Sequence, residues 1–173
     1  YNNEIKFPHL SLLITGGHTQ IYFLKNYNDI KLIGETIDDA IGEAFDKVAK
    51  ILGLPYPGGQ EIEKKALEGN ENSFKLPQPL INEDSFNFSF SGLKTSVNLI
   101  AKKNIINQNF IRDMSASFQK CVGNILTLKL NRVVKELYKF NTKDLSISVV
   151  GGVANNDYLK KCLKNIEKRE TIE

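Results

Sequence analysis

Three glycine pairs, Gly16-Gly17, Gly58-Gly59 and Gly151-Gly152, interrupt the sequence where apolar segments end. Glycine lets another group approach the backbone closely, and free N–H groups at the start of a helix suit a phosphate. The third pair leads from an apolar run toward a helical pattern, with Asn155 and Asn156 where that helix should begin. It is not a GxGxxG sequence, so a Rossmann site is not indicated. A single glycine pair is typical of a simple turn, whereas three at element ends favour a nucleotide cleft.

An acidic face is the second feature that could carry chemistry. Asp39, Glu43 and Asp46 follow the helical spacing i, i+4 and i+7, and Gly42 interrupts the same segment. Like charges one turn apart and a glycine inside a helix both cost stability, which points to a ligand or a backbone segment near this face. A purely structural interpretation also fits, in which Asp46 pairs with Lys50 and Asp39 serves the helix N-terminus.

The tip around Gly16-Gly17 adds polar side chains to a predicted hairpin, because Thr15, His18 and Thr19 flank the glycines. A two-residue hairpin turn requires only the glycines. The sequence contains no Ser-His-Asp arrangement, P-loop, HExxH or CxxC. His9 and His18 are nine residues apart, which is not the spacing of a two-histidine metal site.

Apolar runs and turn residues predict the elements that must position these groups. Strands are expected at Leu10–Thr15, Gln20–Lys25, Ile30–Glu35 and Ile147–Val150, with a short aromatic strand at Phe86, Phe88 and Phe90. Helices are expected at Ile37–Leu52 with Thr36 as N-cap, near Gln60–Leu67, at Leu93–Lys102, at Phe110–Phe140 with a possible interruption, and from about Asn156. Glu68 to Asp84 has the composition of a loop. The order βββα…βα indicates an α/β sheet with a helical insertion between its third and fourth strands.

Charge distribution, hydropathy and cysteine content limit the classes of protein to which the chain can belong. The 173 residues carry a net charge of +3, but residues 1–90 hold 8 Lys and Arg against 13 Asp and Glu, a balance of −5. Residues 91–173 hold 15 against 7, a balance of +8, which is compatible with a polyanionic partner near Lys94, Lys102 and Lys103. No apolar run approaches the ~20 residues of a membrane span. Cys121 and Cys162 lack metal spacing, and we expect reduced thiols in a cytoplasmic protein.

Four stretches together resemble the TsaD family, the tRNA adenosine threonylcarbamoyltransferases, which were formerly called O-sialoglycoprotein endopeptidases. They are ITGGHTQ (14–20), GETIDDAIGEAFDKVAKILGLPYPGG (34–59), FSFSGLKT (88–95) and VVGGVANN (149–156). The resemblance covers nearly the whole chain but only the later part of the family's sequence. It implies the two-lobed, actin-like ATPase (ASKHA) fold. Residues 1–173 would form the second lobe, with a helical insertion at about 60–145, and the first lobe and extreme C-terminus would be absent.

The resemblance also implies which residues bind substrate, although it names no catalytic residue. The hairpin loop matches the segment that contacts the phosphate and acyl end of the substrate: Leu13, Ile14, Thr15, Gly16 and Gly17. Asp46 and Glu63 match the carboxylates that accept ribose hydroxyls. Gly59 matches a backbone contact to the nucleoside, and Asn156 matches an asparagine that contacts nucleotide at a helix start.

The activity that the resemblance implies is transfer of a threonylcarbamoyl group from threonylcarbamoyl-adenylate to N6 of the adenosine beside the anticodon. The tRNA substrates are those that read A-starting codons, and the bacterial partners are the paralogue TsaB and the ATPase TsaE. A divalent metal, iron or zinc, would be held by an HxxxH helix upstream and a DN aspartate downstream. Neither motif occurs here, so we expect this chain alone to bind no metal and to be inactive.

Three alternatives remain beside this interpretation. The former family name implies a metallopeptidase, but the chain offers no metal-bound water with a general base. A non-catalytic nucleotide-binding scaffold is possible for a paralogue of this fold, although Asp46, Glu63 and Asn156 argue against it. A sugar kinase of the same superfamily would carry motifs that this chain lacks.

Overall fold

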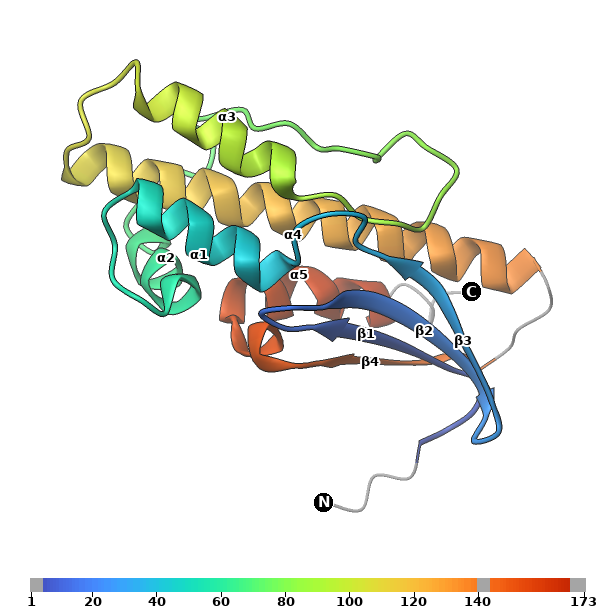
Figure 1. Cartoon of the computed structure of the whole chain (residues 1–173). Coiled ribbons are helices and arrows are strands. Elements are labelled where there is room, and N and C mark those ends of the chain that lie inside the picture. Colours follow the sequence, from blue (N-terminus) through green and yellow to red (C-terminus); the bar gives the residue numbers. More distant parts are fainter. Residues whose placement is uncertain (1–4, 140–143, 169–173) are drawn as a thin grey trace.

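A four-stranded mixed sheet forms one layer of the structure (Figure 1). The computed structural model describes residues 5–139 and 144–168. The strand order is β3-β2-β1-β4, with β1 antiparallel to β2 and parallel to β4. The strands are β1 (His9–Ile14), β2 (Thr19–Asn26), β3 (Asp29–Glu35) and β4 (Ser146–Val150). The α/β class and the four strands predicted from apolar runs are confirmed.

Helices form the second layer, gathered on one side of the sheet (Figure 1). They are α1 (Ile41–Ile51), α2 (Gly58–Ala66), α3 (Ser91–Ala101), α4 (Gln108–Lys139) and α5 (Asp157–Lys168), with a short 3-10 turn, η1 (Gly152–Asn155), before α5. Helices α1 to α4 all lie between β3 and β4 in the chain, which confirms the predicted order. None of these described helices is long and apolar enough to cross a membrane.

The core lies between the two layers. Leu10, Leu12 and Ile14 alternate along β1 and are fully buried, so one face of the sheet supplies the floor of the core. Phe45 of α1 packs edge to face on Phe118 of α4, with ring centroids 5.0 Å apart. Helix α4 is continuous over 32 residues, so the possible interruption predicted within Phe110–Phe140 does not occur in the described part; Phe140 itself lies outside it.

Helix α1 begins at Ile41, four residues later than predicted, and Thr36 is not its N-cap. Residues 36–40 are held in extended or bent conformations by other contacts. The backbone N–H of Thr36 donates to the carbonyl of Thr19 at 2.9 Å, and that of Ile37 donates to Phe88 at 3.0 Å. The hydroxyl of Thr19 accepts from the N–H of Ile41 at 2.9 Å. A side chain 22 residues away therefore caps the helix.

The aromatic segment at residues 86–90 is not a strand, which corrects the prediction made from its alternation. Only an isolated parallel bridge joins Thr36 to Phe88. Phe88 and Phe90 are both fully buried, with stacked rings 6.0 Å apart. Alternation places their rings on one side, as in a strand, but core packing and hydrogen bonds to residues 35–38 hold the segment in place of a continuous strand ladder.

Residues 67–90 form a loop that includes the predicted loop from Glu68 to Asp84, and basic side chains of α4 hold it in place. Lys129 is 1% exposed, and its ammonium donates to the carbonyls of Leu80 at 2.5 Å and Ser85 at 2.7 Å. Arg132 donates to the carbonyls of Ile81 and Glu83. Burial lowers the pKa of the Lys129 ammonium. Nothing in the sequence distinguishes this buried lysine from the exposed lysines of the same helix.

Candidate functional site

A cleft of about 720 Å³ lies where the β1–β2 turn, α1, α2, α4 and the start of α5 converge. Five of the nine residues predicted to bind substrate line it: Gly16, Asp46, Gly59, Glu63 and Asn156. These residues come from four separate segments, and Gly16 and Asn156 are 140 positions apart in the sequence. Gln119 of α4 also lines the cleft, and no motif in the sequence pointed to it.

The other four predicted residues do not line this cleft. The side chain of Ile14 is fully buried in the core, and Leu13 is half-buried in β1. The hydroxyl of Thr15 accepts from the N–H groups of Gly17 at 3.2 Å and His18 at 2.9 Å. Two amides of the turn are therefore engaged within the turn itself, and Gly16 is the residue of the pair that faces the cleft.

The structure explains why helix α1 contains a glycine at residue 42, despite the stability that a helical glycine costs. A Cβ at this position would lie 2.7 Å from the Cα of Gly16 and 2.8 Å from the carbonyl oxygen of Thr15. The N–H of Gly42 also donates to that carbonyl at 3.2 Å. The first turn of α1 therefore needs a glycine because the hairpin turn rests directly on it.

The glycines of the three pairs divide into two groups by their surroundings; Gly16, Gly59 and Gly152 line the cleft, whereas Gly17, Gly58 and Gly151 do not. Gly58 and Gly151 are required by the chain itself, since a Cβ would come within 2.6 Å of Ala49 and 2.2 Å of the Ile14 carbonyl respectively. Gly16 and Gly152 have open space where a Cβ would stand, and neither has a positive φ. No atom of the described chain would obstruct a side chain at these two positions, and the same holds for Gly17, which does not line the cleft.

Asp46 and Glu63 each accept a hydrogen bond through one carboxylate oxygen from the backbone at the start of a helix beside the cleft. Oδ1 of Asp46 accepts from the N–H of Gly58 at 2.8 Å and fixes the start of α2. Oε1 of Glu63 accepts from the N–H of Asp157 at 2.6 Å and fixes the start of α5. The second oxygen of each carboxylate has no hydrogen-bond partner among residues 5–139 and 144–168, which leaves it available to a hydroxyl donor.

Asn156 is the N-cap of α5, as its place in the sequence predicts. Its Oδ1 accepts from the N–H of Leu159 at 2.9 Å, and its Nδ2 donates to Oε1 of Gln119 at 2.9 Å. Asn156 and Gln119 are 7% and 3% exposed. The side chain of Asn156 therefore lies at the wall of the cleft with its amide engaged by Leu159 and Gln119.

Asp39 and Glu43 belong to a separate arrangement outside the cleft. Both carboxylates contact the ammonium of Lys47, at 2.6 Å for Asp39 and 2.9 Å for Glu43. Hydrogen bonds with Asp39 and then Glu43 raise the pKa of Lys47. The like charges one turn apart are compensated by this shared lysine, and only Asp46 of the acidic face lines the cleft.

The described residues contain no group of three His, Cys, Asp or Glu side chains that could hold a metal ion. His9 is buried between the hydroxyls of Ser146 and Ser148, at 2.6 Å and 2.8 Å, and burial lowers its pKa. His18 is exposed at the hairpin tip. Within the described part of the chain, neither histidine therefore belongs to a set of metal ligands.

Comparison of the sequence with known proteins identifies the family of the chain. A family model described as tRNA N6-adenosine threonylcarbamoyltransferase matches residues 1–173. Proteins with that name are similar to the chain in Thermosipho africanus (45% identity, 99% of this chain and 52% of that protein) and in Rickettsia bellii (47%, 96% and 49%). A further one in Wolbachia pipientis wMel is 44% identical over 94% of this chain and 48% of that protein.

The chain spans about half the length of the curated relatives it matches. The family model nevertheless spans the whole of it, residues 1–173, which includes the segments that form the cleft. The chain therefore belongs to the tRNA N6-adenosine threonylcarbamoyltransferase family, and its α/β fold is that expected of an actin-like lobe in this family.

Proposed function

We propose that this chain is the nucleotide-holding lobe of a cytoplasmic enzyme that transfers a threonylcarbamoyl group from threonylcarbamoyl-adenylate to N6 of an adenosine in tRNA. The relatives named for this activity are about twice as long as the chain. The proposal therefore concerns the whole protein, and the chain alone is expected to be inactive.

The proposal rests on the groups that line the cleft, which are open glycine backbone and two carboxylates. Gly16 and Gly152 have no steric need for glycine, and both line the same hollow as Asp46 and Glu63. Bare backbone suits a phosphate, and a free carboxylate oxygen suits a ribose hydroxyl. An adenylate carries both groups, so the arrangement of the cleft matches the nucleotide part of the proposed substrate.

Each residue then has a definite task. Gly16 and Gly152 let the phosphate and acyl end approach the backbone, while Asp46 and Glu63 orient the ribose through their second oxygens. Asn156 and Gln119 keep the start of α5 in position at the cleft. The nucleophile is the adenosine amino group: its nitrogen bonds to the carbamoyl carbon, the bond from that carbon to the phosphate oxygen breaks, AMP leaves, and the amino group loses a proton to solvent. The iron or zinc implied by the resemblance would polarise that carbonyl when bound.

The test uses the full-length protein with threonylcarbamoyl-adenylate, unmodified tRNA and the TsaB and TsaE partners that the resemblance implies. Nucleoside mass spectrometry of the digested tRNA should detect threonylcarbamoyl-adenosine. Asp46→Asn should slow its formation at least about tenfold, because the residue loses a charged acceptor for the ribose. Asp39→Asn, in the segment just before α1, is the matched control, since Asp39 pairs with Lys47 outside the cleft. Absence of product from the wild-type protein with all components would overturn the proposal.

Assays on the same full-length protein distinguish the transferase from the alternative functions. A peptidase would cleave peptides in a reaction that a chelator abolishes. A non-catalytic scaffold would bind adenylate or its partners without forming product. The bare backbone at Gly16 and Gly152 suits a phosphate, which an ordinary peptide lacks, so the cleft favours the transferase over the peptidase.

A further inference from the structure

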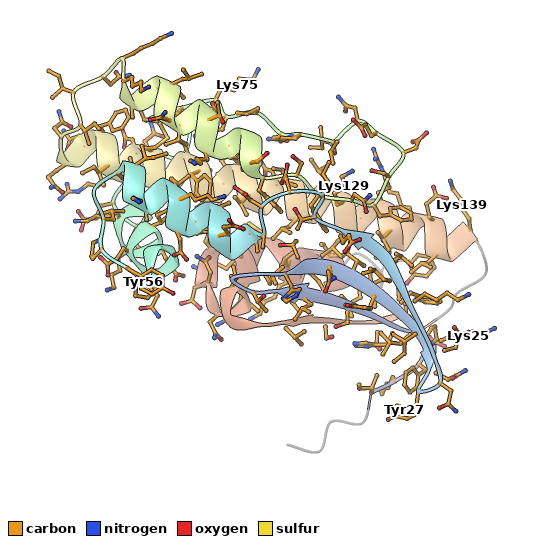
Figure 2. All side chains as sticks on the ribbon, in the orientation of Figure 1. Lys25, Tyr27, Tyr56, Lys75, Lys129 and Lys139 are labelled. Atoms are coloured by element: carbon orange, nitrogen blue, oxygen red, sulfur yellow. The ribbon has the colours of Figure 1, made fainter. Side chains whose placement is uncertain are left out.

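Tyr56 is the most exposed aromatic side chain recorded among the described residues, with 85% of its surface accessible. The phenylalanine rings of the helical layer pack on one another, as in the pairs Phe45–Phe118 and Phe74–Phe110. Figure 2 shows Tyr56 at the turn between α1 and α2, well away from Tyr27, which is 69% exposed at the β2–β3 turn. A single exposed ring is ordinary, so its surroundings decide whether it has a use.

The turn that carries Tyr56 is fixed to the cleft wall. Pro55 and Pro57 flank the tyrosine and restrict the backbone on both sides. Gly58, two residues on, donates to Asp46 at 2.8 Å and packs so tightly on α1 that a Cβ would lie 2.8 Å from the Cα of Asp46. The ring is therefore held outward by a rigid turn whose next residues line the cleft.

A second hollow, of about 320 Å³, lies beside this turn and shares Asp46 with the cleft. Its apolar surface comes from Ala49, Leu54 and Pro55 next to the ring of Tyr56. Lys50 also lines it, is exposed, and is absent from the ion pairs formed among the described residues. Glu43 and Lys47 also line this hollow and pair with each other at 2.9 Å, and the proposed adenylate site assigns no role to Tyr56 or Lys50.

An aromatic platform, an apolar hollow and an unpaired lysine together suit a nucleotide in a single-stranded segment. The ring stacks on an unpaired base, the apolar surface covers the base edge, and the ammonium neutralises the adjoining phosphate. The sharing of Asp46 places this hollow directly next to the site proposed for the adenylate.

We propose that Tyr56 and this hollow bind an unstacked base of the tRNA loop that carries the acceptor adenosine, at a position flanking that adenosine. The inference rests on the proposed function, because it takes tRNA as the substrate. It adds a location to that function, since the α1–α2 turn positions the RNA strand at the mouth of the cleft.

The experiment measures the affinity of the full-length protein for an unmodified tRNA that reads an A-starting codon, by fluorescence anisotropy at fixed salt. Tyr56→Ala should weaken binding about tenfold or more, because the stacking surface is lost. Tyr56→Phe keeps the ring and should bind within about twofold of the wild type. Lys50→Ala should weaken binding less and reduce its salt dependence by about one phosphate contact.

Tyr27→Ala is the matched control, since it removes an exposed ring of the same kind at a distant turn. It should leave tRNA affinity unchanged. AMP affinity, measured by calorimetry, should be unchanged in Tyr56→Ala, because the ring lines the second hollow and not the cleft. This readout separates the two proposals: failure of the wild type to bind AMP would contradict the adenylate site.

Wild-type tRNA affinity in Tyr56→Ala would overturn the inference and leave the adenylate site standing. Equal losses in Tyr56→Ala and Tyr27→Ala would also overturn it, since the effect would not be local. If Tyr56→Ala weakened only assembly with TsaB or TsaE, the turn would be a protein contact, and the nucleic-acid assignment would be wrong.

Discussion

The carboxylate of Glu63 accepts a hydrogen bond from the backbone N–H of Asp157 at 2.6 Å. This contact joins α2 to the first turn of α5 across 94 residues of sequence. A carboxylate at a helix N-terminus satisfies an otherwise unpaired N–H and interacts favourably with the helix dipole. The cleft of this family member is therefore closed on one side by the same residue that is expected to contact its ligand.

Glu63→Ala should lower both stability and AMP affinity in the full-length protein. Losing a charge-assisted hydrogen bond at a half-exposed position should reduce the free energy of unfolding by about 1 kcal/mol. Glu63→Gln keeps an oxygen for Asp157 and should retain most of the stability while still binding AMP more weakly. Urea denaturation and calorimetry measure the two effects. Equal stability losses in both variants would contradict the capping role.

Gly42→Ala and Gly152→Ala should behave in opposite ways. A methyl group at residue 42 would lie within 2.8 Å of the Gly16 turn, whereas one at residue 152 meets no atom of the described chain within 4 Å. Gly42→Ala should therefore lower the melting temperature by several degrees, as about 1–3 kcal/mol of overpacking does. Gly152→Ala should melt like the wild type yet bind AMP at least about tenfold more weakly, because the methyl group obstructs the ligand. Unchanged AMP affinity in Gly152→Ala would contradict the proposed phosphate approach.

Because of Asp38, the free energy of unfolding should decrease as the pH becomes acidic. Burial acts to raise the pKa of its carboxyl, but hydrogen bonds from Ser89, Phe90 and Ser91 outweigh it and lower the pKa below its ordinary value. A depressed pKa in the folded state stabilises the protein above the unfolded pKa of about 4, and this contribution is lost as the pH falls through the folded pKa.

Asp38→Asn should therefore cost more stability at about pH 7 than at about pH 3, measured as the free energy of unfolding by chemical denaturation of the full-length protein. Asp29→Asn at the β2–β3 turn is the matched control, since its carboxylate accepts no hydrogen bond from the described residues. A destabilisation by Asp38→Asn that is the same at both pH values would contradict the linkage.

Charge reversal at Lys94, Lys102 and Lys103 tests whether the basic second half of the chain faces tRNA. All three side chains are exposed on or beside α3. Replacement by glutamate should flatten the dependence of log K on log salt by about 0.7 to 0.9 for each lost phosphate contact. Reversal of Lys6, Lys25 and Lys31, exposed in the acidic first half, changes the net charge equally and should leave the slope unchanged. An unchanged slope in the first variant would place the RNA elsewhere.

The sequence by itself determined the four strands of the sheet, their order along the chain and the position of the hairpin turn. Leu10, Leu12 and Ile14 alternate, and strict alternation buries one face of a strand. The glycine turn between β1 and β2 follows from local chain geometry alone, as does the N-cap at Asn156. Resemblance to the family added the cleft residues, and the fold brings five of these together from distant segments.

Only the tertiary structure decided where α1 begins and what the glycines are for. The cap on Ile41 comes from Thr19, and residues 36–38 bind β2 and residues 88–91, which are contacts that no local pattern encodes. Gly42 and Gly152 look alike in the sequence, yet one lies against the hairpin turn and the other faces open space. Local geometry fixes turns and strands, whereas the use of a glycine, a carboxylate or a buried lysine depends on neighbours that only folding brings near.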